Sequence, residues 1–166
     1  MLGGTRTTIL WLSTLLLIAL GAATPALPAR QETAAALVGR DAAEERALSL
    51  ADLRAMPWTT VATRNQFNDK VVVYRGPLMR DVLARLGLED AEIVSLLAAN
   101  DYSIEAPTQD FREWDVILAM EADGQALPPR ETGPLWVIYP QTGHPELDRS
   151  VYTRRLVWQL VRIEAP

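Results

Sequence analysis

Residues 76–87 read GPLMRDVLARLG and carry the clearest pattern of the sequence. Starting at position 79, four apolar residues follow the i, i+3, i+4, i+7 spacing that gathers side chains on one face of an α-helix. Pro77 can begin this helix because its missing N–H would lack a partner in the first turn anyway. Gly87 is placed to end it. The stretch therefore predicts an amphipathic helix with one buried face.

A hairpin is predicted before this helix. Residues 58–75 contain two runs rich in β-branched residues, and Asn68-Asp69 lies between them as the expected turn. Further upstream, Ser49 and Asp52 have the spacing of a capping box, which predicts a short helix.

After the helix, the sequence alternates between strand and turn patterns. Residues 91–107 read as a second hairpin around Asn100-Asp101, because both residues tolerate the backbone geometry of a turn. Asp123-Gly124 marks a third hairpin. Strands outnumber helices, so the predicted fold class is α+β, with a mainly antiparallel or mixed β sheet and short helices.

The N-terminal residues have the order of a secretory signal peptide. Arg6 precedes an apolar run at residues 9–20, and small residues then offer cleavage after any of three alanines, the last at position 29. A membrane span needs about 20 apolar residues, and this run is shorter, so an uncleaved anchor is the weaker alternative. We expect residues 1–29 to be a signal peptide and the protein to be periplasmic.

The next segment, residues 30–48, is rich in alanine and charged residues and lacks a strong apolar face. This composition predicts a linker. Residues 49–166 are then expected to form one domain, which is long enough to bury a hydrophobic core.

The composition limits the possible functions. The chain has 21 acidic and 16 basic residues and a net charge of −5, which argues against nucleic acid and anionic membranes as partners. It has no cysteine and one histidine, His144. No disulfide can therefore form, and no thiolate can act as a nucleophile or as a metal ligand.

Three acidic residues, Asp110, Glu113 and Asp115, offer oxygen atoms that suit calcium. Their spacing is not that of a calcium-binding loop. We expect an exposed acidic turn here, within one short helical turn that Thr108 caps.

His144, Ser150 and Asp148 are the residue types of a hydrolytic triad. They lie in a polar stretch without the Gly-x-Ser-x-Gly elbow that presents a nucleophilic serine. We expect His144 to be a surface histidine.

Six segments, in this order along the chain, resemble a known family. They read SLADLRAMP, YRGPLMRDVLARLG, AANDYSIEAP, ILAMEADGQALP, GPLWVIYP and VWQLVRI, between about residues 49 and 163. The series resembles the oxidoreductase molybdopterin-binding domain, which has the sulfite-oxidase-like fold. The resemblance implies that fold, a molybdenum-pterin cofactor and an oxidoreductase activity.

The sequence departs from that family where the metal is held. Family enzymes ligate molybdenum with a cysteine thiolate, a soft ligand, soon after the first strand. In this chain Ala62 or Thr63 lies nearest to that place, and neither supplies a thiolate. The N-terminus has one arginine in GGTRTT, which is not the twin-arginine signal of a cofactor-loaded export substrate. We therefore expect the molybdenum function to be lost and no cofactor to be bound.

If a ligand binds, the predicted binding residues are Arg64, Asn65, Asp101, Tyr102 and Tyr139. The resemblance places Arg64 and Asn65 close to the family's cofactor, and a guanidinium can hold an anionic group with two hydrogen bonds. The other three follow or flank turns, where polar side-chain tips can line the mouth of a cleft. Whether the turn around Asp101 also faces a cleft stays open at this point.

Three functions are compatible with these observations. The leading hypothesis is an exported, non-catalytic member of the family that binds a small ligand or an exported or membrane partner protein in the former cofactor cleft. The first alternative is a molybdopterin-dependent oxidoreductase that retains its cofactor without a cysteine ligand. The second alternative is a structural interaction domain that docks through an exposed sheet edge.

Overall fold

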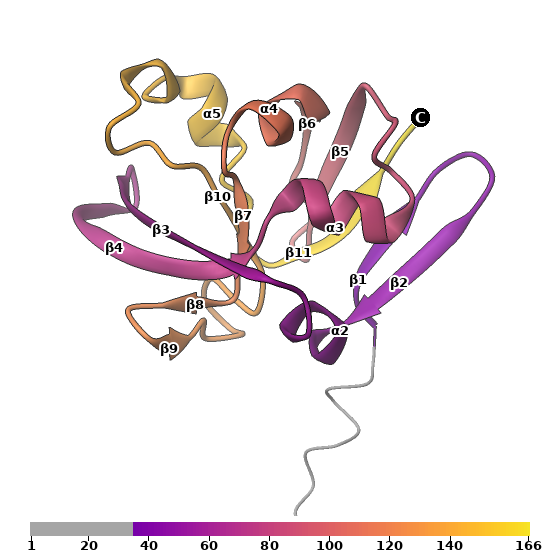
Figure 1. Ribbon diagram of the computed structural model, residues 1–166, viewed down its shortest axis with the longest axis horizontal. Helices are drawn as coiled ribbons and strands as arrows, with labels where there is room; N and C mark the ends of the chain where they lie inside the picture. The colour runs from indigo at the N-terminus through magenta and orange to yellow at the C-terminus, as the bar shows by residue number, and fades with distance from the viewer. Residues whose placement is uncertain (1–34) are drawn as a thin grey trace, which may run out of the picture.

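A five-stranded sheet of order β2-β1-β11-β5-β6 forms one side of the protein in the computed structural model, which describes residues 35–166 (Figure 1). β1 and β11 pair in parallel, and the other neighbours pair antiparallel. The sheet is therefore mixed. Its strands are β1 (Ala35–Arg40), β2 (Glu45–Ser49), β5 (Ile93–Ala98), β6 (Ser103–Pro107) and β11 (Leu160–Glu164).

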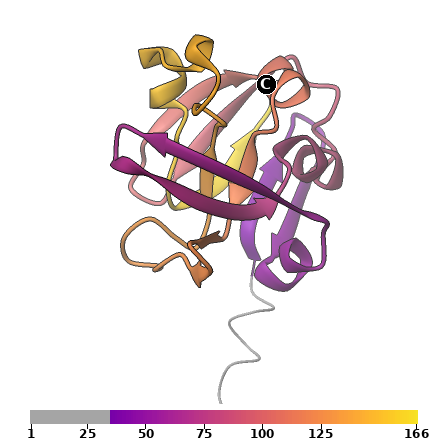
Figure 2. The ribbon, with the colours of Figure 1, turned by 60° about the vertical axis from the view of Figure 1, so that its left-hand side comes forward.

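A second, four-stranded sheet of order β3-β4-β8-β9 is dominated by the long β3–β4 hairpin, which crosses in front of the other strands in Figure 2. A two-stranded sheet of β7 and β10 lies between the two larger sheets (Figure 1). The strands are β3 (Trp58–Asn65), β4 (Asn68–Pro77), β7 (Ile117–Ala119), β8 (Glu121–Ala122), β9 (Gln125–Ala126) and β10 (Trp136–Ile138).

All residues of β7 and β10 are buried, because both faces of this small sheet are covered. Successive side chains of a strand point to opposite faces. Leu118 and Val137 accordingly enter the larger core, which also contains the inward-facing residues of the five-stranded sheet and of α3. Ile117, Trp136 and Ile138 enter a smaller core beneath the β3–β4 hairpin. The β7–β10 pair therefore separates two hydrophobic cores.

The predicted amphipathic helix is confirmed as α3 (Met79–Leu86), whose four periodic apolar residues are all buried. Gly87 ends it with a φ of 74°, the left-handed conformation that glycine adopts without strain. Pro77 is the last residue of β4, and Leu78 is the N-cap. The other helices are α2 (Leu50–Arg54), α4 (Thr108–Glu113), the 3₁₀ turn η1 (Pro145–Leu147) and α5 (Ser150–Arg154).

The predicted linker is wrong for residues 35–48, which form β1 and β2 within the five-stranded sheet. Leu37 is completely buried in the larger core. Gly39 contacts α3 so closely that an added Cβ would lie 2.7 Å from Cβ of Leu86. The domain therefore includes residues 35–48 as well as residues 49–166. The predicted signal peptide, residues 1–29, lies outside the described residues.

The β3–β4 hairpin turns at Gln66-Phe67, so the predicted turn at Asn68-Asp69 is wrong. Asn65 and Asn68 face each other as the last pair of the ladder. The Asn65 side chain starts the turn, because its Oδ1 accepts a hydrogen bond from the Phe67 N–H at 2.9 Å. The hairpin tip therefore presents Gln66 and Phe67.

Thr108 is the first residue of α4, and Pro107 occupies the N-cap position without a side-chain cap. The predicted cap is therefore wrong. The Thr108 hydroxyl donates to the main-chain oxygen of Ala91 instead. The predictions at Ser49 and Asp101 are confirmed: Ser49 forms a capping box with Asp52, and Asp101 lies in a turn with a φ of 65°.

The smaller elements agree with the α+β prediction. The turn between β8 and β9 contains Asp123 and Gly124, with φ values of 48° and 77°, as the Asp-Gly signal predicts.

Within residues 35–166, no helix is long and apolar enough to cross a membrane.

Candidate functional site

Two adjoining cavities open between the tip of the β3–β4 hairpin and the segment around α5. The first, here called the polar pocket, has a volume of about 490 Å³ and is walled by the hairpin tip and the loop after β10. The second, here called the Trp158 pocket, has a volume of about 280 Å³. Gln66 and Thr153 line both cavities, so the two lie side by side.

The structure brings three of the five predicted site residues to these cavities. Arg64 and Asn65 line the polar pocket, and Tyr102 lines the Trp158 pocket. Asp101 is exposed in the turn beside Tyr102 and lines neither cavity. Tyr139 is completely buried and lines neither cavity, so its predicted position at a cleft mouth is wrong.

The polar pocket is held together by β3 and the loop after β10. The Arg64 N–H donates to Oγ1 of Thr142 at 3.0 Å, and the Thr142 N–H donates to Oγ1 of Thr63 at the same distance. Thr63 is completely buried, and its hydroxyl also donates to the main-chain oxygen of Arg64. These bonds fix the wall from which the Arg64 side chain projects.

Arg64 is the one basic residue that lines the polar pocket. Among residues 35–166, no carboxylate lies within ion-pair distance of its guanidinium. Asp69 and Asp148 also line this cavity. Two carboxylates beside one guanidinium favour a ligand with a single negative charge over a multiply charged anion.

Two amide side chains in the polar pocket have buried atoms without a hydrogen-bond partner, namely Nδ2 of Asn65 and Oε1 of Gln141. The other end of each amide is occupied: Asn65 Oδ1 accepts from Phe67, and Gln141 Nε2 donates to the Leu147 oxygen at 2.9 Å. These bonds determine the orientation of both amides. The wall of the polar pocket therefore contains one buried unpaired donor and one buried unpaired acceptor.

The Tyr74 hydroxyl lies near Asn65, but it accepts from the Asn68 amide at 2.9 Å. Burial of the Tyr74 ring raises the pKa of its hydroxyl. The hydroxyl therefore stays protonated at neutral pH. The Asn65 Nδ2 group lies close to it but does not reach hydrogen-bond geometry.

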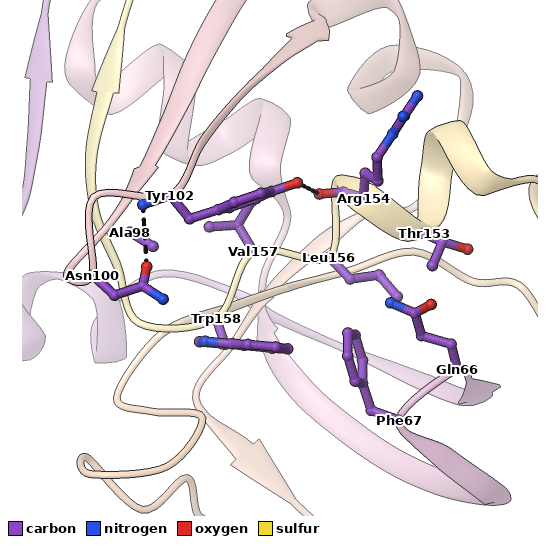
Figure 3. A pocket seen from close by; sticks show the side chains of 10 residues that line it. All are labelled: Gln66, Phe67, Ala98, Asn100, Tyr102, Thr153, Arg154, Leu156, Val157 and Trp158. Atoms are coloured by element: carbon purple, nitrogen blue, oxygen red, sulfur yellow. Dashed lines mark hydrogen bonds between the residues drawn. The ribbon is translucent and has the colours of Figure 1, made fainter.

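The Trp158 pocket has aromatic walls, which Figure 3 shows from close by. The Phe67 and Trp158 rings meet edge to face, with 4.8 Å between their centroids. Tyr102 lies across the cavity from them (Figure 3), and its hydroxyl donates to the Arg154 main-chain oxygen at 2.8 Å. The turn at residues 99–102 therefore does more than connect two strands, because Asn100 and Tyr102 line this cavity.

The sequence-based prediction missed Phe67 and Trp158. Trp158 lies in an apolar segment, as Trp136 does, and such a segment is typical of the core. Trp136 is buried, whereas Trp158 is only partly buried. Phe67 gave a usable signal, because a large apolar residue at the tip of a hairpin is exposed unless a neighbouring element or ligand covers it.

The prediction also missed a buried polar network between α4, β10 and the segment after α5. The Tyr139 hydroxyl donates to Oδ2 of Asp110 at 2.9 Å, and Arg155 donates to the same oxygen at 2.6 Å. Asp110 is buried, so the expected exposed acidic turn is wrong at this residue. Burial, and next the charge of Asp110, raise the pKa of Tyr139 well above its ordinary value.

The remaining sites considered from the sequence do not assemble. Asp115 pairs with Arg80 at 2.9 Å. His144 lies 3.4 Å from Glu146 and packs its ring against Trp114, and its side chain is substantially exposed as predicted. No three His, Cys, Asp or Glu side chains within residues 35–166 are grouped to hold a metal ion.

Residues 26–143 match the family model of the oxidoreductase molybdopterin binding domain, which covers more than half of the chain. The chain belongs to this family. Among solved structures, the fold is similar to that of the sulfane dehydrogenase SoxCD from Paracoccus pantotrophus, with a TM-score of 0.59 and 17% sequence identity. The match covers 78% of this chain and 37% of that chain. No curated protein gives a significant match to the sequence.

These comparisons confirm the predicted family and the sulfite-oxidase-like α+β fold. The family's cofactor, in its cysteine-ligated form, does not fit the residues present. The chain has no cysteine. Of the two residues that the resemblance places nearest to the ligating cysteine, Ala62 has no ligand atom, and Thr63 is buried with its hydroxyl bonded to Thr142 and Arg64.

Proposed function

We propose that this family member is an exported, non-catalytic protein that binds a small polar ligand in the polar pocket. The observation that carries the proposal is the pair of buried, unpaired amide atoms of Asn65 and Gln141 beside the guanidinium of Arg64. An unpaired buried polar atom costs about 1–3 kcal/mol. Because both atoms are covered by the pocket wall, a ligand that displaces this cover, accepts from Asn65 and donates to Gln141 removes the cost at both atoms.

The ligand that fits this arrangement is small and carries one negative charge near Arg64. The guanidinium can donate two parallel hydrogen bonds to a carboxylate. Asp69 and Asp148 disfavour ligands with several negative charges. A monocarboxylate with an additional hydrogen-bonding group therefore matches the donors, acceptors and charges of the polar pocket.

The proposal that the protein is non-catalytic is supported by the missing metal ligand. Cysteine-ligated molybdenum needs a thiolate, and the buried Thr63 hydroxyl is already bonded at 3.0 Å to the Thr142 N–H. The order of residues 1–29 supports export, and the proposed location is the periplasm. A partner protein at the same cleft is the other form of this proposal.

The first experiment determines molybdenum by elemental analysis, and released pterin by fluorescence, in protein isolated from its native compartment. We expect neither above background. Stoichiometric molybdenum with pterin would overturn the proposal in favour of an oxidoreductase that retains its cofactor without a cysteine ligand.

The second experiment measures the melting temperature in the presence of a panel of small monocarboxylates. A ligand that binds the folded state stabilises it by RT ln(1 + L/Kd), where L is the free ligand concentration, so the melting temperature rises with the logarithm of this concentration once it exceeds Kd. We expect Arg64→Ala to remove the increase and Arg130→Ala, in an exposed loop outside both cavities, to keep it. If no member of the panel stabilises the protein, and the protein co-purifies with an exported partner, the structural interaction domain becomes the better explanation.

A further inference from the structure

We infer that the Trp158 pocket is a second binding site, which takes an uncharged planar ring that carries a carbonyl group. This site is separate from the polar pocket and does not depend on a ligand there. The inference follows from the walls of the cavity, from the hydrogen-bonding groups at its two ends and from its charge.

The walls of the Trp158 pocket suit a flat ring. Tyr102 lies on one side, and Trp158 and Phe67 lie on the other, with Leu156 and Val157 between them (Figure 3). Aromatic rings pack favourably in offset or edge-to-face arrangements. Phe67 and Tyr102 are 42% and 41% exposed, which leaves large apolar side chains in water at the edge of a concave surface. A ring inserted between them covers this surface.

The wall formed by Tyr102 is fixed before any ligand binds. Its hydroxyl is bonded to the Arg154 oxygen, and its N–H donates to Oδ1 of Asn100 at 3.2 Å (Figure 3). A preorganised wall lowers the entropy that is lost on binding.

The two ends of the cavity carry side-chain amides, with Asn100 at one end and Gln66 at the other (Figure 3). Because Oδ1 of Asn100 accepts from Tyr102, the Nδ2 group is the end of this amide that remains to donate. An amide N–H donor selects a carbonyl oxygen on the ligand.

The cavity lacks the groups that would stabilise a charged ring. Among residues 35–166, Arg154 is the only charged residue that lines it, and the Arg154 side chain extends away from Trp158 and Phe67 in Figure 3. No carboxylate of this part of the chain lines it. Its volume of about 280 Å³ is at the lower end of small-molecule sites, which are about 300–1,000 Å³, and this size suits one ring or two fused rings.

Menadione, a naphthoquinone, is the first probe, and 2-methylnaphthalene, which has the same carbon skeleton without the carbonyl groups, is its matched control. Quinones often add to protein thiols, but this chain has no cysteine, so that reaction cannot obscure the measurement. Dissociation constants come from equilibrium dialysis of the full chain, with amide chemical shifts to locate the site. We expect menadione to bind at least tenfold more tightly than 2-methylnaphthalene.

A simple pterin is the second probe, because it also carries a ring carbonyl. The ratio of the affinities for menadione and for the pterin shows whether the cavity prefers a quinone or a pterin. Binding of either carbonyl probe at the Trp158 pocket more tightly than 2-methylnaphthalene supports the inference. If neither carbonyl probe binds there more tightly than 2-methylnaphthalene, the inference is overturned.

Variants test the named residues. Asn100→Asp keeps an oxygen for the Tyr102 N–H but replaces the donor with an acceptor, and Phe67→Ala removes one wall at an exposed turn. We expect each to weaken binding of the carbonyl probe at least fivefold, with an unchanged fold by circular dichroism. Val71→Ala, at a somewhat more exposed apolar residue outside the cavity, is the control.

The Arg64→Ala variant separates this inference from the proposed function. We expect it to lose stabilisation by monocarboxylates and to keep its affinity for the carbonyl probe. Unchanged probe affinity in Phe67→Ala would show that the ring binds elsewhere and would refute the site.

Discussion

Asp110 and Arg155 form a largely buried ion pair, with 2.6 Å between Oδ2 and Nη1. The pair joins α4 to the segment that follows α5, and Tyr139 of the core donates to the same carboxylate oxygen. The residues on either side of Arg155, Arg154 and Leu156, line the Trp158 pocket. The ion pair therefore anchors one wall of that cavity to the core.

Asp110→Asn should destabilise the protein strongly. The Asp110 and Arg155 side chains are 11% and 13% exposed, so the substitution leaves a nearly buried guanidinium without its counter-charge, at a cost of about 3–5 kcal/mol. Urea denaturation measures the change in the free energy of unfolding. The matched control is Asp115→Asn, because its pair with Arg80 is exposed and should be worth about 0–1 kcal/mol. Equal losses in both variants would contradict a structural role for the buried pair.

Stability should fall as the pH rises above about 10, the ordinary pKa of tyrosine. Burial, and next the charge of Asp110, raise the pKa of Tyr139 in the folded protein. The folded state therefore holds the proton of Tyr139 more tightly than the unfolded state does. The resulting stabilisation is complete below the pKa of tyrosine in the unfolded chain and is lost as the pH rises through the higher pKa of the folded protein. Urea denaturation at pH 8 to 11 measures how steeply the free energy of unfolding falls with pH, and Tyr139→Phe should reduce this slope.

Part of this alkaline slope should persist in Tyr139→Phe, because burial also raises the pKa of Tyr74. The chain contains one lysine, Lys70, so few other side chains titrate in this range. A slope unaffected by Tyr139→Phe would show that the Tyr139 hydroxyl is not buried as described.

Gly39→Ala should destabilise the protein by about 1–3 kcal/mol, the usual cost of overpacking a core. The new methyl group would lie 2.7 Å from Cβ of Leu86, so β1 and α3 would have to separate. Thermal denaturation gives the change in stability. The new methyl group would also lie 2.9 Å from each Cδ atom of Leu86. Leu86→Ala removes these two atoms and keeps Cβ, so it should relieve part of the cost of Gly39→Ala, and strictly additive effects of the two substitutions would contradict the contact.

Single cysteines at positions 62 and 63 should differ sharply in reactivity. In Ala62→Cys the thiol is on the exposed side of β3, whereas in Thr63→Cys it is buried beneath the loop that contains Thr142. We expect the first to react rapidly with a disulfide reagent and the second to react only on unfolding. Because the natural chain has no cysteine, each rate reports one position. Fast reaction in Thr63→Cys would show that position 63 is open to a metal.

The sequence was most informative where structure depends on neighbours in the chain. The spacing of apolar residues identified α3, and the turn residues identified the hairpins at Asp101 and Asp123. The turn of the β3–β4 hairpin was predicted two residues too late, because Asn65 begins it through its own side chain. Asn65 and Asn68 could each form such a bond to the residues that follow, and the sequence does not distinguish them.

The errors arose where partners are distant in the sequence. β1 looked like a linker because its parallel partner β11 lies more than a hundred residues later. Asp110 and Tyr139 were expected at the surface because their side chains are polar. Their burial is explained by the hydrogen bonds that Arg155 and Tyr139 donate to the Asp110 carboxylate. Phe67 and Trp158 meet across two elements, and no local pattern predicts that contact.

The position of β11 also has a consequence for synthesis and folding. β11 lies between two antiparallel pairs, β2–β1 and β5–β6, which are made earlier in the chain. While the protein is being synthesised, these hairpins can form separately, but each keeps one unpaired edge until residues 160–164 are available. Exposed strand edges promote association between chains, and late, non-local pairing slows folding. The nascent chain therefore depends on β11 to join its two halves and to protect both edges from other molecules.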